Sequence, residues 1–143
     1  MEYKNKRIWN LEDGIWNMEL PKKKIQSFTD LEVWREAHNL VLMVYKITKG
    51  FPKEEIFGLV SQMRRAVVSI TSNITEGFVR QGFKEKLQFY YIALSSLTEL
   101  QNQLLIAKDL DYLNQTEFDD VTLQITSVHK LLNAFISATK KHV

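Results

Sequence analysis

The segment that decides the fold is residues 56–82, which read I-F-G-L-V-S-Q-M-R-R-A-V-V-S-I-T-S-N-I-T-E-G-F-V-R-Q-G. Its apolar residues recur at spacings of three and four, the period of one helical face, and they are Ile56, Leu59, Met63, Val67, Ile70 and Ile74. A polar row that includes Ser69, Asn73 and Glu76 lies about 80–140° around the helix from the centre of this stripe. The segment therefore predicts an amphipathic helix with polar side chains flanking its buried face.

Three further segments of the chain show the same helical period. The first follows Thr29 or Asp30, either of which can cap a helix, and ends at Gly50-Phe51-Pro52. Pro52 suits the first turn of the second helix, and a third helix is expected from about residue 83 to 108. The fourth helix follows Asp109-Leu110-Asp111. Four helices of about 20–27 residues, joined by short turns, predict an all-α, antiparallel up-down-up-down four-helix bundle over residues 28–143.

The first 27 residues differ in character from the rest of the chain. They contain a near-duplicate, Ile8-Trp9-Asn10-Leu11-Glu12 and Ile15-Trp16-Asn17-Met18-Glu19, with two of the three tryptophans of the protein. One interpretation is a docking arm, because aromatic side chains are common anchors at interfaces. The other is a disordered extension, or a start assigned too early, with initiation at Met18. The sequence leaves both open.

Composition and charge limit the classes of function. The net charge is +2, there is no cysteine, and no long apolar run is present, so we expect no membrane span and no disulfide. The basic N-terminus lacks the apolar stretch of a secretory signal, and we expect a cytoplasmic protein. Residues 30–143 hold thirteen basic and thirteen acidic groups, but the charges segregate: residues 64–86 are basic, and residues 99–120 are acidic.

Templates of catalytic and metal sites are missing from the sequence. No Glu-x-x-His pair, H-E-x-x-H, Walker loop or G-x-S-x-G is present. We therefore expect a protein that is not an enzyme, with no catalytic residue, no metal and no cofactor.

The polar row at the end of the 56–82 segment has three interpretations. The triplet Asn73-Ile74-Thr75 matches a glycosylation acceptor, which requires a secreted chain. The structural interpretation is a hydrogen-bonded seam between helices, with the second helix ending at its glycine; it consists of Ser69, Asn73, Glu76, Gly77, Ser95 and Glu99, with Ser96 and Gln103 nearby. The functional interpretation is an anion or nucleic-acid site around the turn, built from Arg64, Arg65, Arg80, Lys84 and Lys86.

Five motifs in order give the sequence a family resemblance. They are F-T-D-L-E-V-W (28–34), G-F-P-K-E-E (50–55), Q-M-R-R-A-V-V-S-I (62–70), S-N-I-T-E-G (72–77) and A-L-S-S-L-T-E-L (93–100). Over about residues 27–140 the chain resembles the bacterial 23S rRNA intervening-sequence proteins, some of them labelled S23 ribosomal protein. This family includes the accessory protein of diversity-generating retroelements.

The resemblance implies a bundle that assembles into a homopentameric ring or barrel. In the retroelement member, a basic surface contacts a reverse transcriptase and nucleic acid. Carried over by position, Arg64 and Arg65 fall in the family's Q-x-R-R segment, and Asn73, Glu76 and Gly77 in its S-N-I-x-E-G turn. Two hypotheses follow. The first is a non-enzymatic homo-oligomeric scaffold whose basic patch binds RNA, DNA or a nucleic-acid enzyme such as a reverse transcriptase. The second is a structural or regulatory protein–protein interaction module that binds no nucleic acid.

Overall fold

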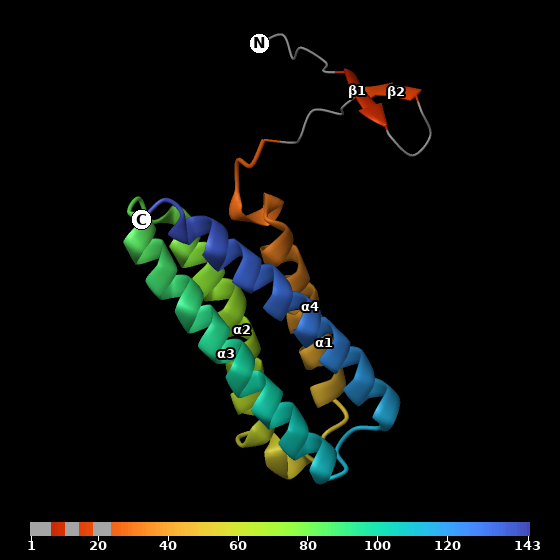
Figure 1. The fold of residues 1–143 in the computed structure, drawn as a ribbon. Coiled ribbons are helices and arrows are strands. Elements are labelled where there is room, and N and C mark those ends of the chain that lie inside the picture. The colour runs from red at the N-terminus through yellow and green to blue at the C-terminus, as the bar shows by residue number, and fades with distance from the viewer. Residues whose placement is uncertain (1–6, 11–14, 19–23) are drawn as a thin grey trace.

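The predicted four-helix bundle is confirmed. A computed structural model describes residues 7–10, 15–18 and 24–143, and within 24–143 every regular element is helical. The long helices are α1 (Glu32–Thr48), α2 (Leu59–Val79), α3 (Phe83–Asp109) and α4 (Gln115–Lys140). Each helix runs antiparallel to the one before it (Figure 1). Helices α2 and α3 form the most extensive contact, and α1 packs on α4 to close the bundle.

The core consists of one stripe from each helix. Because apolar residues recur at helical spacing, each stripe faces the bundle axis and is withdrawn from water. The largest fully buried side chains are Tyr90, Leu40, Met63, Ile70, Ile74, Leu97, Leu100, Leu104 and Leu132. Among the residues that the structure describes, no helix is both long and apolar enough to cross a membrane.

The chain enters α1 through a short 3-10 helix, η1 (Phe28–Asp30). Ser27 caps this turn: its hydroxyl accepts a hydrogen bond from the Thr29 amide at 3.2 Å, and the Asp30 carboxylate accepts one from the Ser27 amide at 3.1 Å. The prediction that Thr29 or Asp30 caps the first long helix was wrong, because the N-cap of α1 is Leu31 and its side chain makes no capping hydrogen bond. Asp30 instead takes the acidic position of a capping box, because its side chain reaches back to the cap amide.

Helix α2 begins later than predicted. Pro52 opens a second 3-10 turn, η2 (Lys53–Glu55), and α2 starts only at Leu59. The delay has a physical cause, because the Glu55 carboxylate accepts a hydrogen bond from the Leu59 amide at 2.9 Å and so satisfies a free donor of the new helix. Residues 56–58 form the turn between the two helices.

Gly77 does not end α2, contrary to the prediction. The helix continues to Val79, and Gly77 is buried within its last turns. Its role is close packing, because a Cβ added there would lie 2.4 Å from Cε1 of Tyr90 on α3. The end of α2 is instead held by Lys86, whose ammonium group donates to the carbonyls of Gly77 at 3.2 Å and Phe78 at 2.7 Å.

The two tryptophan repeats form a β-hairpin that the sequence analysis did not predict. Strand β1 (Arg7–Asn10) pairs antiparallel with β2 (Ile15–Met18), and Trp9 lies opposite Trp16. Figure 1 draws the hairpin apart from the helices. The rest of the predicted extension, residues 1–6, 11–14 and 19–23, lies outside the described residues.

Candidate functional site: a cationic cleft at the α1–α2 turn

The five basic residues predicted to form one patch lie at two ends of the bundle. Arg64 and Arg65 occupy the second turn of α2, whereas Arg80 is its C-terminal cap. Sixteen residues of helix separate Arg64 from Arg80, which corresponds to about 24 Å at 1.5 Å per residue. Lys84 and Lys86 follow at the start of α3, at the same end as Arg80. The five side chains therefore do not gather around one turn, contrary to the functional interpretation of the sequence.

Arg64 is held in the groove between α1 and α2. Its Nε donates a hydrogen bond to the hydroxyl of Thr48 at 3.0 Å, and its guanidinium carbon lies 4.6 Å from the centre of the Tyr45 ring. The Thr48 hydroxyl in turn donates to the Val44 carbonyl at 2.7 Å. Thr48 is buried near the end of α1. The hydrogen bond from Arg64 to Thr48 therefore ties the end of α1 to α2 and fixes the direction of the arginine side chain.

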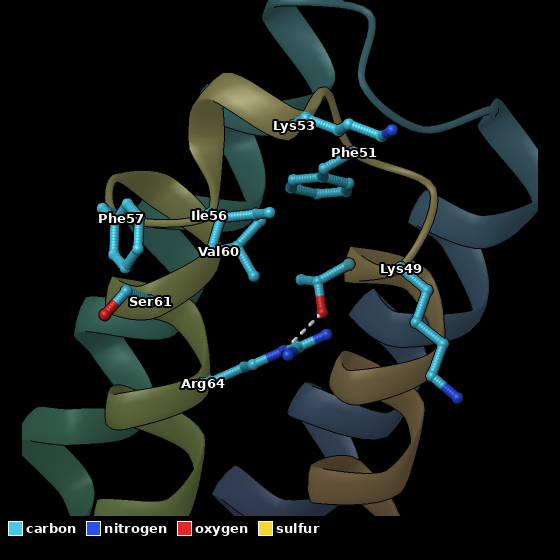
Figure 2. Close-up of a pocket in the computed structure, with 9 residues that line it drawn as sticks. Lys49, Phe51, Lys53, Ile56, Phe57, Val60, Ser61 and Arg64 are labelled. Carbon is cyan, nitrogen blue, oxygen red and sulfur yellow. Dashed lines mark hydrogen bonds between the residues drawn. The ribbon is translucent and has the colours of Figure 1, made fainter.

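A cleft opens beside Arg64, with a volume of about 590 Å³. It is lined by Thr48, Lys49, Phe51, Lys53, Ile56, Phe57, Val60, Ser61 and Arg64. Figure 2 shows Arg64 reaching across one side of it towards Thr48, with Lys49 and Lys53 at its margin and Ile56 and Phe51 turned inwards. Three cationic side chains and no carboxylate line this space, so its field favours an anion.

The turn that borders the cleft is tied to the opposite loop. The Glu55 carboxylate accepts from the Leu59 amide through Oε2 and from the Tyr112 hydroxyl at 3.1 Å through Oε1. Burial, and after it the hydrogen bond to Glu55, raises the pKa of the Tyr112 hydroxyl. In the turn that follows Glu55, the side chain of Phe57 is 97% exposed and that of Ile56 is 52% exposed.

Arg65 points away from this cleft and towards α3. Its Nη2 donates to Glu99 at 2.8 Å and to Gln62 at 2.8 Å. The side chains of Arg65 and Glu99 are 62% and 40% exposed, so we expect this ion pair to contribute at most about 1 kcal/mol to stability. Arg65 therefore remains able to exchange its partner for an anion.

The three basic residues at the other end differ in their contacts. Arg80 pairs with Glu76 at 3.3 Å and lies 4.8 Å from the centre of the Phe89 ring. Lys86 caps α2, and burial lowers its pKa. Lys84 is exposed. Only Lys84 of these three is an unengaged surface cation of the kind that an anion site needs.

The predicted polar seam between α2 and α3 exists in a shorter form. The hydroxyl of Ser69 lies 2.8 Å from that of Ser96, and the Asn73 amide donates to the Ser69 carbonyl at 2.8 Å and to its hydroxyl at 3.0 Å. Ser95, which was predicted to belong to the seam, is exposed, and the buried Ser96 takes its place. Glu99 continues the line by accepting from Gln103 at 3.2 Å.

The remaining predicted seam residues serve other purposes. Glu76 faces Arg80 on the helix surface, and Gly77 packs beneath Tyr90. Within the described part of the chain, no group of three or more His, Asp or Glu side chains is placed to hold a metal ion.

Sequence reasoning missed Lys49, Lys53 and Phe57 as parts of a site. The sequence does contain a signal for Phe57, because this aromatic residue lies between the apolar positions Ile56 and Leu59 and outside the buried stripe of α2. An aromatic residue at such a position is expected to be exposed. Lys49 and Lys53 flank Gly50-Phe51-Pro52, the segment predicted to join the first two helices.

Comparison with known proteins assigns this chain to a family. The fold is a small antiparallel four-helix bundle. The chain belongs to the family of 23S rRNA-intervening sequence proteins, whose pattern it matches over residues 29–134. A comparison with curated proteins gave no match.

A solved structure shares the fold. It is a protein of unknown function from the S23 ribosomal protein family of Bacteroides thetaiotaomicron, with a TM-score of 0.68 and 22% sequence identity. The match covers 73% of this chain and 95% of that one. At this identity the likeness supports the bundle itself.

Proposed function

We propose that this protein is a non-enzymatic, cytoplasmic, homo-oligomeric scaffold that binds RNA or DNA through basic side chains at one end of the bundle. The observation that carries the proposal is the cleft at the α1–α2 turn, whose lining residues include Lys49, Lys53 and Arg64 and no carboxylate. Phosphate groups are the commonest partners of such clusters. Arg65 lies one residue further along α2, but its side chain points away from the cleft towards Glu99 and offers a further cation on the face shared with α3.

Oligomerisation would strengthen a weak single site. Residues 30–143 carry no net charge, so one copy offers only a local positive field. Several copies in a ring would present the same cleft repeatedly to one nucleic-acid chain, and linked sites raise the apparent affinity well above that of one site. The family resemblance implies five copies.

Binding is tested by titrating a fluorescently labelled, structured RNA at 50 mM and 200 mM salt. We expect binding at low salt, a steep loss at high salt, and clear weakening by Arg64→Ala combined with Arg65→Ala. Lys130→Ala on α4 is the control, because Lys130 is an exposed lysine outside the cleft. An absence of binding at low salt, or an affinity unchanged by the double substitution, would refute the proposal.

Assembly is tested separately by light scattering on the purified protein. We expect a mass of about five times the 16.8 kDa of one chain. A mass near 16.8 kDa at micromolar concentration would exclude the ring.

The second candidate function is a protein–protein interaction module without nucleic-acid binding. It is favoured by apolar side chains left exposed on α3, namely Tyr91, Ile92, Leu105 and Ile106. Affinity purification from the source cell, followed by nuclease treatment, distinguishes the two functions. The module predicts a protein partner that survives the nuclease, whereas the scaffold predicts that co-purified material is lost with the nucleic acid.

A further inference from the structure

We propose that the cleft at the α1–α2 turn recognises a single nucleoside phosphate unit, with the base against Phe57 and Ile56 and the phosphate on Lys49, Lys53 and Arg64. This inference rests on the proposed nucleic-acid function and gives it a site and a unit of recognition. The unit is an unpaired nucleotide of a single-stranded segment or a free nucleotide, because both present the same flat base and the same anion.

The anion side of the site is preorganised. The Nε of Arg64 donates a hydrogen bond to the Thr48 hydroxyl at 3.0 Å, and the guanidinium group stacks on the Tyr45 ring. The two terminal amino groups of Arg64 therefore remain available to phosphate oxygens. Arginine loses less freedom on binding when its guanidinium plane is already fixed. Lys49 and Lys53 line the same space, and rotation of their long side chains would bring their ammonium groups towards a phosphate held by Arg64.

The base side of the site is an exposed aromatic ring that the fold does not need. Phe57 is 97% exposed, so its ring contributes almost nothing to the core. The Glu55 carboxylate holds the preceding turn in place through the Leu59 amide and the Tyr112 hydroxyl. An aromatic side chain that a fixed turn presents beside cations is the combination on which bases stack in proteins that bind single strands.

The volume of the cleft is compatible with one nucleotide. Its volume of about 590 Å³ lies within the range of about 300–1,000 Å³ that is common for small-molecule sites. A base within a duplex is stacked on both faces and cannot also cover Phe57, so an unpaired base is required. The site therefore favours single strands, loops and ends over continuous duplex.

The test is fluorescence anisotropy with a labelled ten-nucleotide single-stranded RNA and a blunt duplex of the same length, using the full chain. We expect the single strand to bind more tightly than the duplex. Phe57→Ala should weaken single-strand binding by about tenfold and duplex binding by less than twofold. Lys49→Ala combined with Lys53→Ala should reduce the salt dependence by about two phosphate contacts.

Two control variants match these substitutions in type. Leu123→Ala removes an apolar side chain that is 70% exposed on α4, and Lys130→Ala removes an exposed lysine of the same helix. Both should bind RNA within twofold of the unmodified chain. Circular dichroism and light scattering on every variant verify that the bundle and its mass are unchanged.

The outcomes separate this inference from the proposed function. If RNA binds but Phe57→Ala and the double lysine variant match the controls, the inference is wrong and the proposed function stands. If neither RNA binds at low salt but a mononucleotide binds by calorimetry and loses affinity with Phe57→Ala, the cleft is a nucleotide site and the proposed function is wrong. If Phe57→Ala changes the mass of the assembly, Phe57 belongs to a subunit contact and the inference is overturned.

A competition arm distinguishes the two sources of the nucleotide. Unlabelled mononucleotide that displaces the labelled RNA at equal concentration indicates a free nucleotide as the ligand. Displacement only by unlabelled oligonucleotide indicates an unpaired segment of a longer chain. Either result supports the assigned site.

Discussion

Gly77 of α2 lies directly against the ring of Tyr90 on α3. A Cβ built on Gly77 would stand 2.4 Å from Cε1 of Tyr90 and 3.1 Å from Cβ of Phe89. The first distance is shorter than real Cβ contacts and the second is tighter than most of them, so α2 and α3 approach this closely because residue 77 has no side chain. Tyr90 itself is 1% exposed and packs with its ring 4.7 Å from that of Phe135.

Gly77→Ala should therefore destabilise the protein by roughly 1–3 kcal/mol, the usual cost of overpacking a core. The sign of this stability change is informative, because replacing a glycine inside a helix by alanine ordinarily stabilises the helix by about 1 kcal/mol. Urea unfolding followed by circular dichroism measures the change. Gly82→Ala is the control, since a Cβ at Gly82 meets nothing within 4 Å. An unchanged or higher stability for Gly77→Ala would refute the packing role.

Stability should also fall in alkaline solution because of Tyr90. Burial raises the pKa of its hydroxyl from 10.0 to about 12. The folded chain therefore keeps the phenolic proton after the unfolded chain has lost it. The contribution of protonated Tyr90 to the free energy of unfolding is complete below pH 10 and is lost as the pH rises from 10 to 12. For a shift of about two pKa units the total loss is roughly 2–3 kcal/mol.

The measurement is the free energy of unfolding in urea at pH 9, 10.5 and 11.5, for the natural chain and for Tyr90→Phe. Other tyrosines and lysines titrate in both proteins, so the difference between the two curves isolates Tyr90. We expect the phenylalanine variant to lose less stability above pH 10. Parallel curves would contradict the assignment.

Lys86 should act as a structural residue. Its ammonium group donates to the last carbonyls of α2, those of Gly77 and Phe78, where the negative end of the helix dipole also favours a cation. Lys86→Met keeps the length of the side chain and removes both bonds, and we expect a loss of about 1–3 kcal/mol. Thermal unfolding measures it. Lys84→Met, two residues away and exposed, should change stability by no more than about 0.5 kcal/mol.

The seam between α2 and α3 makes a prediction about coupling. Ser69→Ala and Ser96→Ala each remove one side of the 2.8 Å contact between the two hydroxyls. A double-mutant cycle should give an interaction energy of about 0.5–1.5 kcal/mol. Ser95→Ala replaces an exposed serine adjacent in sequence and should show no coupling with Ser69. A coupling of zero for Ser69 and Ser96 would mean that the contact adds nothing to the packing of α2 on α3.

The bundle could be predicted from sequence because helical period is a local property. The apolar stripe of α2 fixes which face is buried, and the other three helices repeat that pattern. The role of Gly77 could not be predicted in this way. A glycine near the end of a helical pattern is typical of a helix terminus, and only the position of Tyr90 on another helix reveals that the space beside Gly77 is occupied.

The site was harder to predict because it depends on distance in space. Arg64, Arg65 and Arg80 are near each other in sequence, yet a straight helix separates the first and last by about 24 Å. Ser95 and Ser96 are neighbours in the chain, but a rotation of about 100° puts only Ser96 in the seam. The tryptophan repeat alone does not indicate a hairpin, whereas the dipeptide Asp13-Gly14 between its two copies is a typical hairpin signal.

The bond between Glu55 and Tyr112 joins the α1–α2 turn to the α3–α4 turn, residues that are 57 positions apart in the chain. Opening either turn breaks this bond, and opening of the α1–α2 turn also frees the Leu59 amide that the same carboxylate holds. The backbone amides of both turns should therefore exchange with solvent deuterium as one cooperative unit with a shared opening free energy. Occupation of the cleft would then slow exchange at residues near Tyr112, on the loop that the ligand never touches.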